Sequence, residues 1–237
     1  MTKKPYLTPD QIRRSCQVMI PGDEREQEMC AINGELEQGF SILEKATNGK
    51  KSVTFYGSAR TQEGDPLYEA ARALAYRLTN ELGVTVVTGG GPGIMEAANR
   101  GAVEADGDSI GLTIKLPNEQ ATNKFVLQEI PFDFFFTRKV LLFFSAEAYI
   151  FFPGGYGTFD EFFELVTLIQ TEKIPRMPII LFGKEFWSRL DNLIKEEMVE
   201  KYKTLSDEER SLYTITDDPN EVVRIVKETD QRSHEGK

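Results

Sequence analysis

The chain has 237 residues, of which 40% are hydrophobic, and its formal net charge is −10. This length and apolar content fit one large α/β domain, or a domain with an appendage, while the acidic balance excludes general electrostatic attraction to nucleic acid or anionic membranes. No apolar run reaches the roughly 18–20 residues of a membrane span, and no signal-peptide core follows the N-terminus. Cys16 and Cys30 lack CxxC spacing, so we expect free thiols and a cytoplasmic protein.

Missing residue patterns narrow the chemistry further. The only histidine is His234, in a polar C-terminal stretch, which argues against a Ser-His-Asp triad, a Cys-His pair and a histidine-rich zinc site. The sequence has no GxxxxGK(S/T) segment, so a Walker-type triphosphate site is not expected. Acid–base chemistry must therefore come from carboxylates, lysine, tyrosine or arginine-assisted groups.

The hydrophobic pattern divides the chain into three parts. Residues 1–50 predict an amphipathic helical extension, clearest from Glu24 to Thr47, which serves as a cap, an oligomer arm or ordinary core cover. Over residues 51–230, strands and helices alternate, which predicts an α/β Rossmann-like, doubly wound parallel sheet with helices on both faces. Residues 231–237 form a polar tail. The expected strands are 53–56, 84–88, 109–114, 126–131, 148–152, 178–182 and 213–216, and the helices after the extension are 66–82, 94–105, 134–147, 158–170, 185–202 and 219–229.

Two early strands end in glycine-containing turns. Gly57-Ser58 follows the first strand and can donate N–H and O–H groups to a ligand. Gly89-Gly-Gly-Pro-Gly93 follows the second strand but does not match GxGxxG, and the next strand ends at Lys115 rather than at an acid that would hold a ribose of NAD. We therefore expect nucleotide binding without a dinucleotide site. The alternative is that these glycines only permit close packing.

Two cations interrupt the apolar helix predicted at 134–147. Arg138 and Lys139 stand among phenylalanines and leucines. Either both side chains reach solvent along their apolar stems, or Arg138 points into the cleft at the carboxyl edge of the sheet. In the second case its fork-shaped donors suit phosphate, ribose hydroxyls or a carboxylate.

The central signal is the segment Pro153-Gly-Gly-Tyr-Gly-Thr-Phe-Asp-Glu161. It joins the end of a buried strand to the start of a helix, where converging backbone N–H groups and the helix dipole favour phosphate. Glu161 lies about one turn into that helix. It is either a residue that satisfies the helix dipole or a carboxylate beside a bound phosphate, where it could act on a sugar.

These segments resemble the LONELY GUY proteins, the cytokinin riboside 5′-monophosphate phosphoribohydrolases. Residues 153–161 match their PGGxGTxxE motif, Gly89 to Met95 is similar to their GGGxxGLM segment, and Tyr56-Gly-Ser58 is similar to their first βα loop. The Arg138-Lys139 pair matches a family helix, and the resemblance covers roughly residues 50–230. The long N-terminus and Glu96, where short members have glycine, resemble the longer, often bacterial branch.

The resemblance implies hydrolysis of the N-glycosidic bond of a nucleoside 5′-monophosphate, such as AMP or a cytokinin precursor, by Arg138 and Glu161. It implies no metal or redox cofactor and a homodimer or larger homo-oligomer. The substrate-binding residues that it implies are Gly57, Ser58, Gly89, Gly90, Gly91, Met95, Lys139, Gly154, Gly155, Tyr156, Gly157 and Thr158.

Two further functions stay open at this point. The wider group includes proteins that bind a molybdenum-cofactor nucleotide-like ligand, so the chain could carry a ligand without cleaving it, or be an oligomer with a vestigial site. Some members are labelled lysine decarboxylases. A pyridoxal enzyme needs a lysine Schiff base with supporting partners, and the sequence has no His-Lys pair to support that label.

Overall fold

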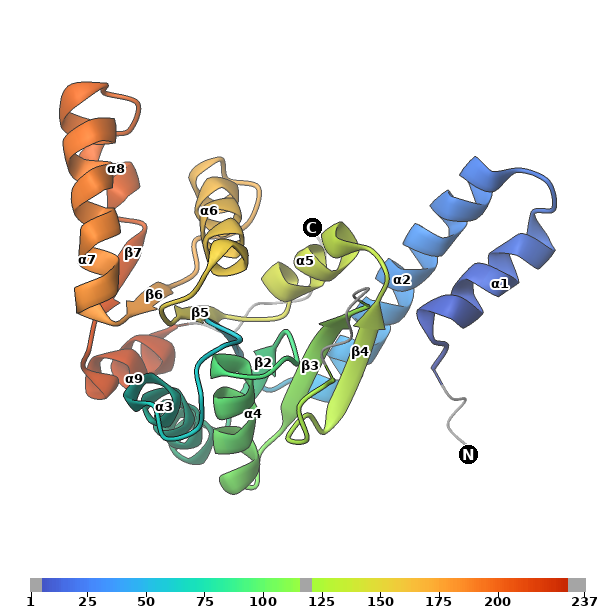
Figure 1. Ribbon diagram of the computed structural model, residues 1–237, viewed down its shortest axis with the longest axis horizontal. Helices are drawn as coiled ribbons and strands as arrows, with labels where there is room; N and C mark the ends of the chain where they lie inside the picture. The colour runs from blue at the N-terminus through green and yellow to red at the C-terminus, as the bar shows by residue number, and fades with distance from the viewer. Residues whose placement is uncertain (1–5, 116–120, 230–237) are drawn as a thin grey trace.

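The computed structural model describes residues 6–115 and 121–229. Seven parallel strands in these ranges form one sheet in the order β4-β3-β2-β1-β5-β6-β7. The chain winds outward from β1 in both directions (Figure 1), which confirms the predicted doubly wound α/β fold. The strands are β1 (Ser52–Tyr56), β2 (Thr85–Thr88), β3 (Ser109–Ile114), β4 (Gln128–Phe132), β5 (Ala148–Phe151), β6 (Ile179–Phe182) and β7 (Tyr213–Thr216).

Helices cover both faces of this sheet. They are α1 (Pro9–Met19), α2 (Glu24–Thr47), α3 (Pro66–Leu82), α4 (Ile94–Glu104), α5 (Phe135–Phe144), α6 (Tyr156–Gln170), α7 (Lys184–Leu193), α8 (Asp207–Arg210) and α9 (Pro219–Glu228), and a π-helix, η1 (Ile194–Lys201), continues α7. One hydrophobic core joins α3, α4 and α9 to the sheet, and a second joins α2, α5, α6 and α7 to the opposite face. None of the described helices is both long and apolar enough to cross a membrane.

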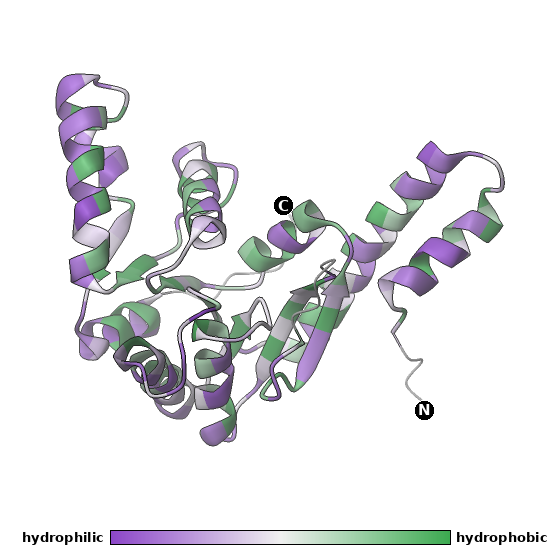
Figure 2. Ribbon diagram, viewed as in Figure 1, coloured by the Kyte–Doolittle hydropathy of each residue, from purple (hydrophilic) through white to green (hydrophobic). Residues whose placement is uncertain are grey.

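The central strands are hydrophobic without alternation because both of their faces are covered. Every residue of β1, β2, β5 and β6 is buried, as expected for parallel strands between two helical layers. Figure 2 shows the same contrast, with hydrophobic colour on β5, β6 and α5 and hydrophilic colour over much of α1 and α7. Strand β1 lies at the centre, where Val53 pairs with Val86 of β2 and with Ala148 of β5.

The N-terminal extension is a helical hairpin at the β4 edge of the sheet (Figure 1). The prediction of free thiols is wrong, because Cys16 of α1 and Cys30 of α2 form a disulfide with their Cα atoms 5.9 Å apart. The turn at residues 20–23 places the two helices against each other, so cysteines separated by 14 positions become neighbours. The inner half of α2 joins the main core through Ile42 and Leu43.

The remaining differences from the predicted elements are small. The helix predicted at 134–147 ends at Phe144, because the Ser145 hydroxyl donates to the Leu142 carbonyl (2.8 Å) and the Glu147 carboxylate accepts the Ser52 N–H (2.7 Å). The helix predicted at 185–202 changes to π-helix at Ile194. The predicted polar tail, 231–237, and His234 within it lie outside the described residues.

Candidate active site

Three loops meet at the carboxyl ends of the central strands, as the sequence predicts. Ser58, after β1, connects them: its backbone N–H donates to the Pro153 carbonyl (3.1 Å), and its own carbonyl accepts the Ile94 N–H (3.0 Å). Gly57 lies directly over Ile94, where an added Cβ would come within 2.7 Å of the isoleucine side chain. The turns after β1, β2 and β5 therefore form one continuous surface.

The need for glycine on this surface is clearest at Gly93 and Gly154. Gly93 has a φ of +73°, and a Cβ there would overlap the Ser58 carbonyl oxygen. At Gly154 a Cβ would overlap the hydroxyl of Thr158, whose buried side chain folds back over the turn. Gly155 and Gly157, in contrast, have open space where a side chain would stand. The turn is therefore tight on its inner side and open on its outer side.

The helix that follows this turn begins without a side-chain cap. Gly155 is the N-cap of α6, and among the described residues no side-chain hydrogen bond caps the first turn. The first N–H groups of a helix have no partner within the helix, and the dipole makes them attractive to anions. The turn at residues 154–158 thus has the backbone arrangement of an anion site.

Glu161 is the electrostatically unusual residue of the site. It is 8% exposed, and its Oε2 atom has no hydrogen-bond partner within the described parts of the chain. Burial raises the pKa of Glu161 to about 7, although the nearby positive charges of Arg138 and Lys139 act to lower it. A buried carboxylate that titrates near neutral pH is typical of groups that transfer protons or stabilise charge in a reaction.

Arg138 connects this carboxylate to the glycine triplet after β2. An added Cβ on Gly89 would lie 2.8 Å from an Arg138 guanidinium nitrogen and 3.0 Å from the Met95 sulfur. The Arg138 Nε atom is buried and unpaired among the described residues. Burial lowers the pKa of Arg138, and the negative charge of Glu161 opposes that change. The sequence left open whether the Arg138 side chain reaches solvent or points into the site. In the structure it lies inside the site.

Tyr56 is a site residue that the chemical interpretation of the sequence missed. It ends β1, is 6% exposed, and stacks on Phe151 with ring centroids 4.4 Å apart. Its hydroxyl is buried and has no hydrogen-bond partner in the described structure. Burial, and next the negative charge of Glu161, raise the pKa of Tyr56 well above its ordinary value. The available signal was its position, immediately before Gly57 at the end of the central strand.

Two residues expected in the site have other surroundings. The Lys139 ammonium donates to the Asp160 carboxylate (2.9 Å) and pairs with Glu164, so it ties α5 to α6. The Tyr156 side chain is 96% exposed. Lys139 still acts on Glu161, because its positive charge helps to lower the pKa of that carboxyl. Tyr156 belongs to the turn at residues 154–158, where it is exposed to solvent.

A cleft of about 640 Å³ lies on the β2 side of Arg138. Its walls are the glycine triplet 89–91, Met95, Arg138, the ends of β3 and β4, and Pro9 and Asp10 from the start of α1. The turn at 154–158 and Glu161 do not line this cleft, so Arg138 is the residue that joins the two parts of the site.

A buried amide network braces the glycine triplet. The Asn123 side-chain N–H₂ lies within 3.1 Å of the carbonyls of Gly90 and Gly91 and of the Asn99 side-chain oxygen. Asn99 in turn accepts from Thr88 (2.7 Å). No pattern in the sequence pointed to Asn123, whereas Asn99 is a polar residue on the otherwise apolar buried face of α4.

Within residues 6–115 and 121–229, no group of three or more His, Cys, Asp or Glu side chains has the arrangement to hold a metal ion. The positive charges that act on the pKa of Glu161 are those of Arg138 and Lys139.

Solved structures share the fold at low sequence identity. The molybdenum cofactor binding protein from Rippkaea orientalis is 21% identical over 75% of this chain and 96% of its own, with a TM-score of 0.52. The molybdenum cofactor carrier protein from Chlamydomonas reinhardtii is 22% identical over the same shares, with a TM-score of 0.54. DNA processing protein A from Streptococcus pneumoniae is 12% identical, covers 94% of this chain and 89% of its own, and has a TM-score of 0.53.

Sequence comparisons identify the family. No curated protein sequence matches the chain. The model of the family described as possible lysine decarboxylase matches residues 95–226, which is more than half of the chain and includes Arg138, the glycine turn and Glu161. The chain therefore belongs to this family, which is the family of the LONELY GUY proteins.

Proposed function

We propose that this protein hydrolyses the N-glycosidic bond of nucleoside 5′-monophosphates, releasing the free base and ribose 5-phosphate. Its family and fold support a nucleotide-related function. The observation that carries the specific reaction is Glu161, a buried carboxylate with a pKa of about 7 that lies beside Arg138 and within two turns of a helix N-terminus without a side-chain cap.

In the proposed complex, the phosphate binds to the N–H groups at the start of α6. Gly155 and Gly157 leave room for it, and the helix dipole stabilises its charge. This contact fixes the distance of the ribose from Glu161. Because remote binding contacts can orient the reacting group, loss of the phosphate lowers kcat as well as affinity.

As the bond between C1′ and the base breaks, positive charge develops on the ribose. The ionised Glu161 carboxylate stabilises this charge and removes a proton from the attacking water. The water oxygen bonds to C1′ as the C1′–N bond breaks. The leaving base takes up one proton from solvent and Glu161 returns to solvent the proton that it removed, so the net reaction consumes one water. One well-placed electrostatic group of this kind contributes roughly 3–4 kcal/mol to lowering the barrier.

Arg138 has a different part in the proposal. A guanidinium does not readily give up a proton, so we assign it to hold Glu161 in its ionised form and to bind ribose or phosphate oxygens. The position of its guanidinium beside Gly89 supports this assignment, because it places the charge of Arg138 at the cleft by the glycine triplet.

A carrier of a nucleotide-like cofactor is the second candidate. Two of the structural neighbours, a molybdenum cofactor binding protein and a carrier protein, favour it by name. A carrier requires an anion-binding turn, but it does not require a buried carboxylate that has an oxygen without a hydrogen-bond partner among the described residues. We therefore prefer hydrolysis. Lys139, the lysine beside the site, is bonded to two carboxylates, which gives the decarboxylase label no support.

The test is release of free base, measured by chromatography, from a panel of nucleotides and their nucleosides. We expect AMP to be cleaved and adenosine barely to react. Glu161→Gln should lower turnover about a hundredfold or more while nucleotide binding persists. The control is Glu172→Gln, an exposed carboxylate just beyond the other end of α6, which should retain full turnover. Tight binding of nucleotides without release of base by the unaltered protein would favour the carrier.

The cytoplasmic location expected from the sequence stays a prediction. It depended in part on free thiols, and Cys16 and Cys30 are joined in a disulfide. The cytokinin precursor as a particular substrate also stays a prediction, and the panel should include it.

A further inference from the structure

We propose that Glu35, in the N-terminal hairpin, is a positioning residue for Arg138, because it holds the start of the helix that carries the arginine. The role of Arg138 in turnover rests on the proposed function, but the positioning itself does not. This inference gives the hairpin a task at the site in addition to covering the core.

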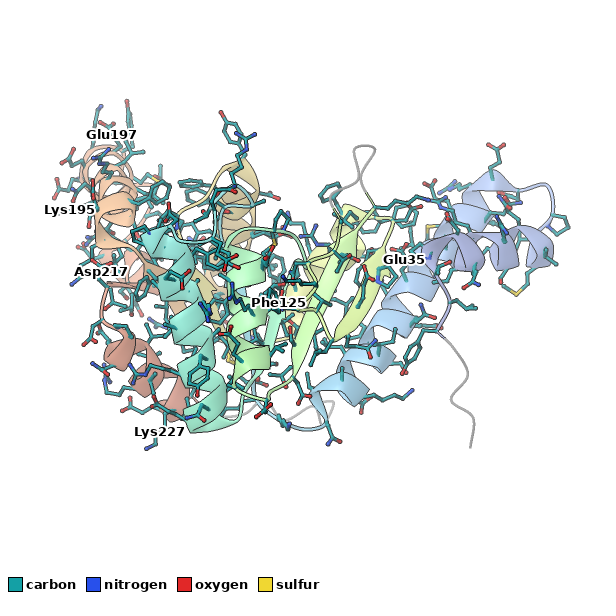
Figure 3. All side chains as sticks on the ribbon, turned by 60° about the horizontal axis from the view of Figure 1, so that its bottom comes forward. Glu35, Phe125, Lys195, Glu197, Asp217 and Lys227 are labelled. Carbon is teal, nitrogen blue, oxygen red and sulfur yellow. A yellow bond between two sulfur atoms is a disulfide. The ribbon has the colours of Figure 1, made fainter. Side chains whose placement is uncertain are left out.

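Glu35 binds the residues immediately before and within the first turn of α5. One carboxylate oxygen accepts the backbone N–H of Asp133 (2.8 Å), and the other accepts the N–H of Phe134 at 3.4 Å. The Thr137 hydroxyl lies 2.8 Å from that second oxygen and 2.8 Å from the Phe134 carbonyl, so its single proton serves both. Figure 3 labels Glu35 where α2 meets the β4 side of the sheet.

Helix α5 has no cap of its own to fix its first turn. Its N-cap is Phe134, whose side chain cannot accept a hydrogen bond, and the helix has no acidic residue in its first turn. Glu35 supplies, from 99 positions earlier in the chain, the acceptor that Ser, Asp or Asn usually supplies locally. Its negative charge also complements the dipole at this end of α5.

The same hairpin holds these residues from a second side. The Arg13 guanidinium of α1 donates to the Asp133 carboxylate (2.6 Å) and lies over the Phe134 ring, 4.8 Å from its centroid. The disulfide between Cys16 and Cys30 joins α1 to α2 near these contacts. Asp133 and Phe134 are thus fixed by both helices of the hairpin.

Arg138 follows directly from this anchored turn. Its backbone N–H donates to the Phe134 carbonyl (3.3 Å), and Thr137 precedes it in the chain. A shift of the first turn of α5 therefore moves the Cα of Arg138 and, with it, the guanidinium between Gly89 and Glu161.

The burial of Glu35 favours a positioning role over one in which the side chain only fills space. The residue is 3% exposed, and burial raises its pKa despite the hydrogen bonds from Thr137, Asp133 and Phe134. A buried carboxylate is unfavourable unless hydrogen bonds compensate for its loss of water. All the bonds of Glu35 that we identify go to the start of α5.

The consequence is measurable at Glu161 without any turnover. Arg138 and Lys139 of α5 act to lower the pKa of Glu161, while Asp160 and Glu164, which lie with Glu161 on α6, act to raise it. The Tyr56 hydroxyl of β1 also faces Glu161. If the hold on α5 is released, the Arg138 charge moves away from Glu161. The pKa of Glu161 should then rise, by up to about one unit.

The experiment is a ¹³C-carboxyl NMR titration of glutamate-labelled protein, with the Glu161 signal assigned from Glu161→Gln. We expect Glu35→Gln to raise the pKa of Glu161 in the direction of Arg138→Ala, which sets the full effect. Glu37→Gln, on the exposed side of α2 two residues further on, is the control and should change nothing. Thr137→Val removes the hydroxyl that bonds Glu35 and the Phe134 carbonyl, and it should give a smaller rise in the pKa of Glu161. This variant replaces Glu35→Gln as the test if Glu35→Gln does not fold.

An unchanged pKa of Glu161 in folded Glu35→Gln and Thr137→Val, while Arg138→Ala raises it, would overturn the proposal. No rise in Arg138→Ala itself would overturn it too, because the arginine would then not act on Glu161. If the proposed hydrolysis is correct, the acid limb of the pH profile should move with the NMR value. If the unaltered protein releases no base, the titration still decides the role of Glu35.

Discussion

Replacing Glu161 by glutamine should make the protein more stable at alkaline pH while it strongly lowers the proposed activity. Glutamine has the shape of the protonated acid but cannot ionise. In the native protein the carboxylate is buried, and its pKa is about 7 compared with an ordinary value of 4.5. The unfolded chain therefore releases the Glu161 proton at lower pH than the native protein does, and ionisation favours unfolding.

The size of the effect follows from that difference. Each pKa unit corresponds to 1.36 kcal/mol, so full ionisation of Glu161 costs the native state about 3 kcal/mol. The dependence of stability on pH has the opposite sign to that of a salt-bridged carboxylate, whose ionisation stabilises the native state. The cost is absent well below pH 4.5, grows as pH rises through the interval from 4.5 to 7, and is complete by about pH 8. Because Glu161 is only 8% exposed, solvent screening reduces the value little.

Urea unfolding at two pH values measures this difference. At pH 8 we expect Glu161→Gln to unfold with a free energy about 3 kcal/mol greater than that of the unaltered protein, which in a domain of this size raises the Tm by roughly 6–12 °C. At pH 5 the difference should fall below about 1 kcal/mol. Glu37→Gln, an exposed substitution, should match the unaltered protein at both pH values.

A constant difference between the variant and the unaltered protein at pH 5 and pH 8 would refute the reasoning. It would mean that Glu161 has an ordinary pKa and is solvated or fully paired in the native state. The proposed catalytic part would then lose its electrostatic basis, whatever the measured turnover.

Three further predictions address the turn, the tyrosine and the assembly. In the same urea series, Gly154→Ala should destabilise the protein by about 1–3 kcal/mol, because the added Cβ would overlap Thr158. Gly155→Ala should change the stability by less than about 1 kcal/mol, because there is open space at that position. Equal effects of the two substitutions would contradict the close contact between Gly154 and Thr158. Tyr56→Phe should lower base release about tenfold without lowering the Tm, because it removes a buried hydroxyl that has no hydrogen-bond partner among the described residues and is free to bind the substrate. Full turnover would show that the hydroxyl has no role. Light scattering at micromolar concentration should give at least twice the monomer mass of 26.8 kDa, since α5 exposes several aromatic side chains, and a monomer would contradict this.

The sequence predicted most elements well because their limits are set locally. The bounds of α2 and α3 were correct to the residue: Asp23 and Asp65 cap their first turns, and Asn48 and Gly83 close them in the left-handed conformation. The glycine turns, Arg138 and Glu161 were also found from the sequence, since each follows the end of a strand or lies within a turn or two of a helix start.

What the sequence could not provide depends on contacts between distant segments. The start of α5 is fixed by Glu35, and its end by the bond between Glu147 and Ser52, so the local pattern overestimated its length. The disulfide depends on how two helices face each other. Lys139 matched a family position, but its partners on α6 became visible only when the two helices were packed.

The central position of β1 affects the order in which the protein can fold. Its two ladders connect it to β2, about 30 residues later, and to β5, about 95 residues later. At a synthesis rate of about 5–20 residues per second, β1 leaves the ribosome on the order of ten seconds before its second neighbour exists. During that time one edge of the most buried strand lacks its native partner and is open to pairing with other chains. Because the turn at residues 154–158 follows β5 directly, a chain that stops before Ala148 has neither a closed sheet centre nor a complete candidate site, so this site cannot assemble before β5 has been synthesised.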